Sequence, residues 1–400
     1  MRGKLLILGA LGVAASAATL VPILSMQQEQ PAQAWVWTLP SWMAAPPVPA
    51  DVVMTDALVD LGRHLFYDAR LSSDGTIACA SCHQQSAGFS DGRVTAIGVD
   101  GTEGRRNAPG LANVGYMPTL TWVNPHFDTL EFQALTPLFG TDPDEMGNAG
   151  REATMFAGLS ADPYYEVAFP RAFPDRPGPD LFTVTRALAA FQRTLVSFDS
   201  PYDQVAYGND PEAMSAAARR GQDLFFDHRF ECYHCHAAPL FTDNIQTTRT
   251  AFPESAYHNT GLYNIGQDGA YPSGASGLAE FTGRAEDMGR FRTPSLRNVA
   301  VTAPYMHDGS IATLREVLDH YAAGGRTIPE GPHAGIGSQN PHLDPLIVGF
   351  RASDAEISDL IAFLESLTDQ SFLSDPAFAD PWPDGHPAMA QRQMPFPVQH

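Results

Sequence analysis

The pentapeptide Cys-Tyr-His-Cys-His lies at residues 232–236, and Cys-Ala-Ser-Cys-His at residues 79–83 repeats its pattern. A similar helical segment precedes each motif: Leu-Gly-Arg-His-Leu-Phe-Tyr-Asp at 61–68 and Arg-Gly-Gln-Asp-Leu-Phe-Phe-Asp at 220–227. Cys-x-x-Cys-His is the attachment signature of c-type haem, in which the thiols add to the vinyl groups and the histidine binds iron. Two copies of one unit predict two cytochrome-c-like domains with one haem each.

The chain has four cysteines, and all of them lie in these motifs, so none is left for a disulfide. A single motif could be a zinc half-site, but two motifs behind the same helix pattern favour haem. His234 lies inside the second motif and is interpreted as a spacer. The sequence therefore predicts covalent haem attachment by Cys79, Cys82, Cys232 and Cys235, with His83 and His236 as iron ligands.

The N-terminus has the pattern of an export signal. Basic residues Arg2 and Lys4 precede an apolar run at 5–24, and Ala32-Gln33-Ala34 forms a small-residue cleavage site. Residues 1–34 are therefore predicted to be a signal peptide. The apolar run is nearly long enough to span a bilayer, so an uncleaved N-terminal anchor is the alternative. In either case we expect the working part in the periplasm.

The charge balance limits the possible partners. The sequence has 45 acidic residues against 24 Lys and Arg, a formal net charge of −21. Nucleic acids and anionic membranes need a basic surface, which argues against both. We expect membrane contact only if the N-terminal segment is retained.

The remaining pattern is mainly helical. Apolar residues recur at helical spacing over 184–195 and 357–367, and they resemble the closing helix of a cytochrome c fold in each half. Long Gly- and Pro-rich stretches between the helices are expected to be ordered loops. The predicted divisions are an N-terminal domain at 50–205, a C-terminal domain at 206–375 and an irregular tail at 376–400.

Further motifs carry a family resemblance: Phe-Ser-Asp-Gly at 89–92, Arg-Asn-Ala-Pro at 106–109, Arg-Thr-Pro-Ser-Leu-Arg-Asn at 292–298 and Thr-Ala-Pro-Tyr-Met-His-Asp-Gly at 302–309. With the haem motifs, they make the sequence resemble the bacterial di-haem cytochrome c peroxidase and MauG superfamily over nearly all of residues 50–370. Segments such as Trp37-Thr-Leu-Pro40 and 286–291 are similar to its MbnH-like branch. Enzymes of that branch accompany a copper-binding partner, MbnP.

The resemblance implies that the haem on His83 meets peroxide. Peroxidases of the family cap that iron with a histidine at the position of Val99, and residues 98–106 contain no histidine, which implies an open site. Gln133 and Glu145 match the family's distal pair. A carboxylate there can move a proton as general acid–base while the amide orients peroxide. Pro137 is expected to shape the pocket wall.

The haem on His236 is implied to store or relay charge. Peroxidases of the family place a methionine on its other face, whereas the matching position here is Tyr321, as in MauG-like enzymes. Met306 and His320 remain competing ligands. Trp122 matches the family's inter-haem tryptophan, but the usual Trp-Asp-Gly-Arg is here Trp-Val-Asn-Pro, so local packing must differ.

A calcium ion is implied between the two domains. Asn107, with the backbone carbonyls of Thr302 and Pro304, matches the family's calcium site, and hard oxygen ligands suit Ca²⁺. His307 is expected to bond a haem propionate. The implied cofactors are thus two covalently bound haem c groups and Ca²⁺.

Taken together, we expect a di-haem enzyme that uses H2O2 to form a high-valent bis-haem state and oxidises a protein substrate by long-range electron transfer. The resemblance to the MbnH-like branch implies conversion of tryptophan to kynurenine on an MbnP-like copper-binding protein. Two alternatives remain open. One is a cytochrome c peroxidase that reduces H2O2 to water with small electron-donor proteins, and the other is a non-enzymatic di-haem electron carrier.

Overall fold

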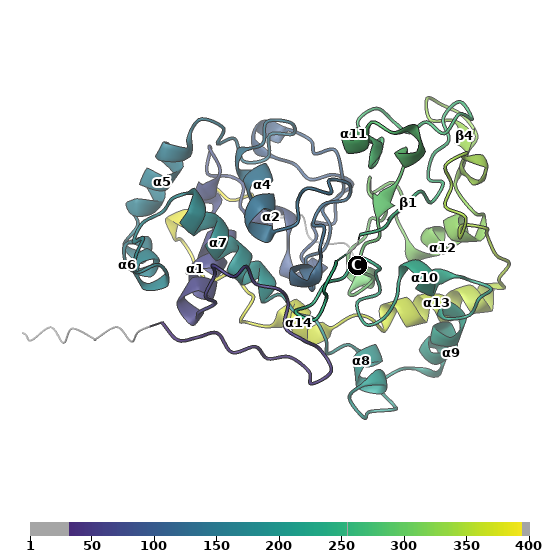
Figure 1. Cartoon of the computed structure of the whole chain (residues 1–400), viewed down its shortest axis with the longest axis horizontal. Coiled ribbons are helices and arrows are strands. Elements are labelled where there is room, and N and C mark those ends of the chain that lie inside the picture. The colour runs from purple at the N-terminus through teal and green to yellow at the C-terminus, as the bar shows by residue number, and fades with distance from the viewer. Residues whose placement is uncertain (1–31, 254, 394–400) are drawn as a thin grey trace, which may run out of the picture. The chain divides into compact units, whose positions relative to one another are not determined.

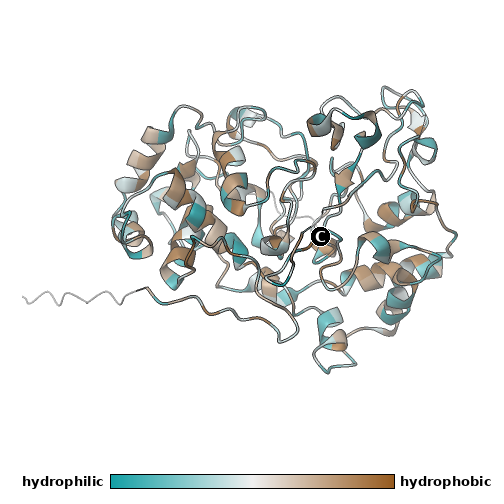
Figure 2. Ribbon diagram, in the orientation of Figure 1, coloured by the Kyte–Doolittle hydropathy of each residue, from teal (hydrophilic) through white to brown (hydrophobic). Residues whose placement is uncertain are grey.

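The computed structural model describes residues 32–253 and 255–393, so most of the predicted signal peptide or anchor lies outside the described residues. Helices joined by long loops dominate the fold (Figure 1). Hydrophobic and hydrophilic positions mix along them (Figure 2), and no helix among the described residues is both long and apolar enough to cross a membrane. The prediction of a mainly helical fold is confirmed.

The regular elements are short. The α-helices are α1 Asp56–Phe66, α2 Cys79–Cys82, α3 Leu130–Gln133, α4 Leu135–Phe139, α5 Glu152–Ser160, α6 Pro163–Ala172, α7 Leu181–Arg193, α8 Pro201–Ala206, α9 Ala216–Phe225, α10 Cys232–Cys235, α11 Ala279–Thr282, α12 Leu314–Ala322, α13 Asp354–Glu365 and α14 Gln370–Ser374. The 3-10 turns are η1 Ala69–Leu71, η2 Gln85–Ala87, η3 Val99–Gly101, η4 Val114–Tyr116, η5 Ala285–Asp287, η6 Val299–Val301, η7 Gly337–Gln339 and η8 Pro387–Met389. The strands form two antiparallel pairs, β1 Tyr257–His258 with β2 Phe291–Arg292 and β3 Thr327–Ile328 with β4 Gly335–Ile336.

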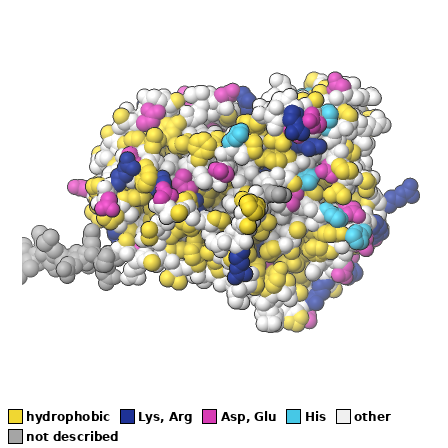
Figure 3. Space-filling model, in the orientation of Figure 1, with side chains coloured by type: hydrophobic (Ala, Val, Ile, Leu, Met, Phe, Trp, Pro, Cys, Tyr) yellow, Lys and Arg dark blue, Asp and Glu magenta, His cyan; other side chains and the backbone are white. Residues whose placement is uncertain are grey.

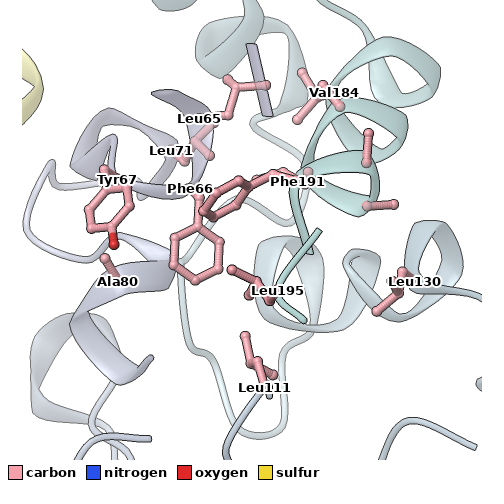
Figure 4. Packing of buried hydrophobic residues seen from close by; sticks show 14 of the residues in the cluster. Leu65, Phe66, Tyr67, Leu71, Ala80, Leu111, Leu130, Val184, Phe191 and Leu195 are labelled. Carbon is pink, nitrogen blue, oxygen red and sulfur yellow. The ribbon is translucent and has the colours of Figure 1, made fainter. Parts of the chain in front are cut away.

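Helices α1 and α7 cross at very close range. Thr55 begins α1, its side chain accepting a hydrogen bond from the Leu58 N–H at 3.1 Å. At the crossing stands Gly62, where a Cβ atom would lie 1.8 Å from the carbonyl oxygen of Ala187. The aromatic rings of Phe66 and Phe191 meet edge to face beside it, with centroids 5.2 Å apart (Figure 4). Only glycine permits this approach of the two backbones.

Helices α9 and α13 repeat that crossing in the second half of the chain. A Cβ atom on Gly221 would lie 1.9 Å from the carbonyl oxygen of Asp359. Gly62 and Gly221 occupy the same position in the two repeated segments that precede the Cys-x-x-Cys-His motifs. The internal repeat therefore sets the helix packing of both halves.

The loops after the two motifs repeat as well. Asn113 and Asn298 both adopt a left-handed backbone, with φ of 60° and 59°, and begin η4 and η6. Their N–H groups donate to the carbonyls of Leu195 at 2.7 Å and Leu367 at 3.1 Å. Each asparagine thus ties the loop behind a motif to the segment that follows the long helix of its half.

Two large hydrophobic clusters and a smaller third one, around Leu262 and Tyr271, organise the described chain. The first gathers α1, α7 and their loops, and the second gathers α9, α13 and α12. The chain returns to the first cluster after α13, because Phe372 of α14 and Trp382 are buried in it. The indole N–H of Trp382 donates to the carbonyl of His64 at 3.0 Å. The segment after 376, described to residue 393, has only η8 as regular structure, yet it is fastened to the first cluster.

The acidic surplus is not confined to one patch on the face shown in Figure 3. Acidic side chains are spread over this face, and several lie beside basic ones. Ion pairs such as Arg171 with Asp56 and Arg220 with Asp359 belong to this pattern of neighbouring opposite charges.

Candidate haem-binding sites

The second motif borders a cavity of about 260 Å³. Cys232, Cys235 and His236 line it. The Nδ1 of His236 lies 3.0 Å from the carbonyl oxygen of Phe241, which has a left-handed φ of 52°. Because Nδ1–H donates to this carbonyl, Nε2 is free to bind iron, as a metal-bound histidine requires. Burial lowers the pKa of His236, which keeps the ring neutral and able to act as a ligand.

Tyr321 and His320 are neighbours on α12, yet they face different spaces. Tyr321 lines the cavity of the second motif, as does Met306. His320 instead lines a separate pocket beside Glu316 and Arg326. Both ring nitrogens of His320 lack a hydrogen-bond partner among the described residues, and burial lowers its pKa to about 4. The structure therefore brings Tyr321 and Met306, but not His320, to the wall of the cavity.

The Tyr321 phenol is buried beside the second motif. Burial raises the pKa of this phenol well above its usual value, with the nearby Cys235 and Cys232 sulfurs adding to the effect. No described residue donates a hydrogen bond that would stabilise a phenolate there. An ionised Tyr321 would therefore need a cation inside the cavity, and a haem iron could supply the positive charge.

Arg292 is a cavity residue that the sequence reasoning did not single out. Its side chain is buried, and its guanidinium donates to the backbone carbonyls of Thr121 at 2.9 Å and Thr293 at 3.3 Å. No carboxylate among the described residues pairs with it. Burial lowers the pKa of Arg292 to about 10, so it stays charged at neutral pH. A buried cation without a carboxylate partner fits an anionic group in the cavity, such as a haem propionate.

Two histidines, His307 and His258, also line the cavity. The Nε2 of His307 is buried without a partner among the described residues, and its ring stacks on Phe291 at 3.6 Å. Burial lowers the pKa of His307 to about 4, so the ring is neutral and has a hydrogen bond to offer. Although burial opposes its charge, hydrogen bonds to Asp243 and Asp344, both at 2.7 Å, raise the pKa of His258 to about 12. His258, although it lines the cavity, is not among the predicted site residues.

Trp122 and the predicted calcium ligands meet at the same cavity. Trp122, Asn107, Thr302 and Pro304 all line it. The indole N–H of Trp122 donates to the Asn107 carbonyl at 2.9 Å, and the Asn107 side-chain amide donates to the carbonyl of Arg93 at 2.7 Å. The side-chain oxygen of Asn107 accepts no hydrogen bond from the described residues. It is available, with neighbouring carbonyls, to a hard cation such as Ca²⁺.

The first motif has the same histidine geometry as the second. The Nδ1 of His83 lies 2.7 Å from the carbonyl oxygen of Phe89, whose φ is 61°. Burial lowers the pKa of His83, as it does for His236. Each motif is thus followed by a phenylalanine in a left-handed conformation whose carbonyl fixes the histidine tautomer. The residues around both motifs therefore fit c-type haem.

Glu145 lies beside the first motif. Its negative charge contributes, after burial, to raising the pKa of both Cys79 and Cys82. Burial also raises the pKa of Glu145 itself. The backbone N–H of the buried Val99 donates to the backbone carbonyl of Glu145 at 3.0 Å. This hydrogen bond ties residues 98–106, the loop without a histidine, to Glu145.

Gln133 and Pro137 lie on consecutive short helices. Gln133 ends α3, and Pro137 lies one turn later in α4. The Gln133 side chain makes no hydrogen bond with the described residues, so the structure gives no direct link between it and Glu145.

Comparisons with known proteins identify the family. A family model for di-haem cytochrome c peroxidase matches residues 56–211. The chain is 36% identical to methylamine utilization protein MauG of Methylorubrum extorquens, covering 80% of this chain and 81% of the relative. It is also 36% identical to cytochrome-c peroxidase IdrP1 of Denitromonas iodatirespirans, covering 80% and 84%.

A solved structure of a MauG-like protein associated with microbial copper homeostasis is 48% identical, with a TM-score of 0.85, and covers 88% of this chain and 100% of that one. The diheme peroxidase BthA from Burkholderia thailandensis, at 24% identity and a TM-score of 0.62, shares the fold over 84% and 93% of the two chains. From its motifs, its site geometry and these relatives, the chain belongs to the di-haem cytochrome c peroxidase and MauG family of haem-dependent oxidoreductases.

Proposed function

We propose that this enzyme uses H2O2 to oxidise a side chain of a partner protein by long-range electron transfer. It would hold one haem covalently on Cys79 and Cys82 and another on Cys232 and Cys235, in two cytochrome-c-like halves. The haems supply the peroxide and electron-transfer chemistry when bound. The protein's own contribution is to make the two sites unequal.

Tyr321 carries this proposal. It lines the cavity of His236, where a peroxidase of the family has a methionine. A phenolate is a hard anionic ligand that favours oxidised iron, whereas methionine favours reduced iron. Tyr321 therefore suits a haem site that oxidises a side chain which gives up electrons reluctantly. It suits a site that stores electrons less well.

The site of His83 supports the same reading. The buried Val99 occupies the position at which peroxidases carry a capping histidine, and its backbone is tied to Glu145. We infer that the side of this site facing peroxide stays open. Glu145 would accept the proton from peroxide and return it to the leaving oxygen, and Gln133 would orient the peroxide. Pro137 would limit the space beside them.

Two contacts of Trp122 support a role for it between the two sites. Trp122 lines the cavity of the second motif and donates a hydrogen bond to Asn107. The next residue, Ala108, accepts a hydrogen bond at 3.0 Å from the hydroxyl of Ser90, which lies in the loop after the first motif. We propose that Trp122 relays electrons and that Ca²⁺ on Asn107, Thr302 and Pro304 fixes its surroundings.

The proposed partner is an MbnP-like copper-binding protein, and both proteins would be exported to the periplasm. The likeness to a MauG-like protein associated with copper homeostasis supports this choice. The target would be a tryptophan converted to kynurenine. In a balanced reaction, the indole gives up four electrons and four protons and takes two oxygen atoms from water, while two molecules of H2O2 accept those electrons and protons and become four molecules of water. Hydrolysis then releases formate.

Intact-mass spectrometry of the partner tests the proposal. The purified di-haem protein is incubated with H2O2 and an MbnP-like copper-binding protein. We expect the mass shift of tryptophan-to-kynurenine conversion, located by peptide mapping and absent when the target tryptophan is replaced by phenylalanine. An unchanged mass under conditions in which peroxide is consumed contradicts the proposal.

A cytochrome c peroxidase is the second candidate, favoured by the 36% identity to peroxidase IdrP1. Fast peroxide turnover with reduced cytochrome c or a small copper protein, with no change in the partner's mass, would support it. The electron-carrier alternative is disfavoured, because the family consists of haem-dependent enzymes.

A further inference from the structure

Three metal-ligating side chains gather on the surface just before the second motif. They are His228, Glu231 and His234. The Nε2 of His234 lies 2.6 Å from one Glu231 carboxylate oxygen, and the Nδ1 of His228 lies 3.8 Å from the other. One ligand atom from each of the three side chains lies within 4.8 Å of the others. The carboxylate therefore stands between two imidazoles.

An ion can reach this cluster from solvent. The His228 side chain is 84% exposed, that of His234 is 37% exposed and that of Glu231 is 24% exposed. The Tyr233 hydroxyl lies 2.9 Å from the Nδ1 of His228, so an ion that binds this nitrogen replaces that contact. Small rotations of two exposed imidazoles would bring the three ligand atoms to bonding distance of one ion.

The backbone that carries the cluster is ordered. Glu231 has a left-handed φ of 56°, a conformation that non-glycine residues rarely adopt, and stands directly before α10. The turn is closed by hydrogen bonds to Asp227, whose carbonyl accepts from the Phe230 N–H at 3.0 Å and whose carboxylate accepts from the Arg229 N–H at 2.7 Å. The unusual conformation of Glu231 is thus held in place by its neighbours.

The first motif shows that haem attachment does not require these residues. In the internal repeat, His228, Glu231 and His234 correspond to Ala69, Ala78 and Ser81. Ala78 has an ordinary extended φ of −110° where Glu231 is left-handed. The three ligands and the backbone turn that groups them therefore belong to the second half alone.

We propose that His228, Glu231 and His234 form a surface site for a divalent transition-metal ion of the Zn²⁺ or Cu²⁺ class. Two imidazoles and one carboxylate are a ligand set that both ions accept, and Cu²⁺ binds such sets more tightly than Zn²⁺. Three protein ligands leave a coordination position for water or a donor from another protein. The site is independent of the proposed haem chemistry.

Titration of the complete di-haem protein with Zn²⁺ alone tests the site, by calorimetry and by anomalous diffraction from soaked crystals. We expect one ion between His228, Glu231 and His234. His228→Ala and His234→Gln should each weaken binding by about tenfold or more, because each removes a ligand of three. His333→Ala is the matched control, since it removes an exposed histidine outside the cluster.

Because His234 lies inside the haem motif, the haem content of each variant is measured from its pyridine haemochrome spectrum. His228→Ala lies outside the motif and keeps the test valid even if His234→Gln attaches haem poorly. Cu²⁺ that displaces the bound Zn²⁺ supports the site. Zn²⁺ binding that is equal in the wild type and in His228→Ala, or anomalous density elsewhere only, overturns it.

Discussion

The indole N–H of Trp122 donates a 2.9 Å hydrogen bond to the backbone carbonyl of Asn107. The N–H of the same asparagine donates to the carbonyl of His307 at 2.9 Å, and its side-chain amide is bonded to Arg93. Asn107, itself a proposed calcium ligand, thus joins the proposed relay Trp122 to His307, a histidine that lines the cavity. A substitution at Asn107 should therefore disturb Trp122, the proposed calcium site and His307 together.

Replacing Trp122 with phenylalanine should separate peroxide consumption from partner oxidation. The ring still fills the space, but the residue is harder to oxidise and leaves the Asn107 carbonyl without its donor. We expect the first reaction with H2O2 in stopped-flow absorbance to be retained and the mass change of the partner to be strongly slowed. Trp382→Phe is the control, because Trp382 is buried against the segment of His64 instead. Equal slowing in both variants would remove Trp122 from the path.

Removing calcium should slow the same step. A chelator would leave the Asn107 side-chain oxygen and the carbonyls of Thr302 and Pro304 without their cation, which loosens the anchor of Trp122. We expect partner oxidation to fall and to return when Ca²⁺ is added back, but not with Mg²⁺, which demands a tighter octahedral site. Metal analysis of the purified protein provides the stoichiometry. A protein that holds no Ca²⁺ and ignores the chelator would contradict the site.

Glu145→Gln should slow the reaction with peroxide by roughly 10²–10⁴-fold, the usual contribution of general acid–base catalysis. Burial raises the pKa of Glu145 above its ordinary value of 4.5. The carboxylate that accepts a proton therefore forms only as the pH rises past this raised value, and the wild-type rate should climb with pH through it. The glutamine variant should lose this inflection, whereas Glu166→Gln, at an exposed acid of α6, should keep both rate and profile. An unchanged profile in Glu145→Gln would rule out this role.

Alanine at the helix crossings should destabilise the fold without touching the sites. A Cβ at Gly62 or Gly221 would meet a carbonyl oxygen at 1.8 or 1.9 Å, so the helices must move apart, at a cost of about 1–3 kcal/mol each. Gly158→Ala in α5 is the control, because a Cβ there meets nothing within 4 Å. That variant should gain up to about 1 kcal/mol of helix propensity. Guanidinium unfolding gives the three values, and equal stability of Gly62→Ala and Gly158→Ala would contradict the described crossing.

Much of the architecture could be predicted from the sequence, because the relevant signals are local. The two motifs and the helical segments before them indicated a mainly helical chain with two similar halves. The choice between Tyr321 and His320 was harder. Adjacent residues on a helix point about 100° apart, so the pattern alone cannot say which one faces a cavity. The family register favoured Tyr321, and in the structure only Tyr321 of the two lines the cavity of His236.

The residues that sequence reasoning missed depend on contacts between distant segments. Arg292 faces the cavity because its backbone N–H donates to the Trp122 carbonyl at 2.9 Å and its side chain to Thr121. No local sequence pattern predicts such a contact between distant segments. The left-handed conformations of Phe89 and Phe241 were equally hidden, because phenylalanine is not a residue that signals positive φ. The attachment of Trp382 to the first cluster is likewise a tertiary contact.

We propose that the two irons differ, with an open site at His83 and a site capped by Tyr321 at His236. The electron paramagnetic resonance spectrum of the fully oxidised enzyme tests it most directly, recorded for the wild type and for Tyr321→Phe. We predict one high-spin and one low-spin ferric signal in the wild type, and loss of the low-spin signal in the variant. Two low-spin signals in the wild type, or a low-spin signal that survives in Tyr321→Phe, would contradict the account.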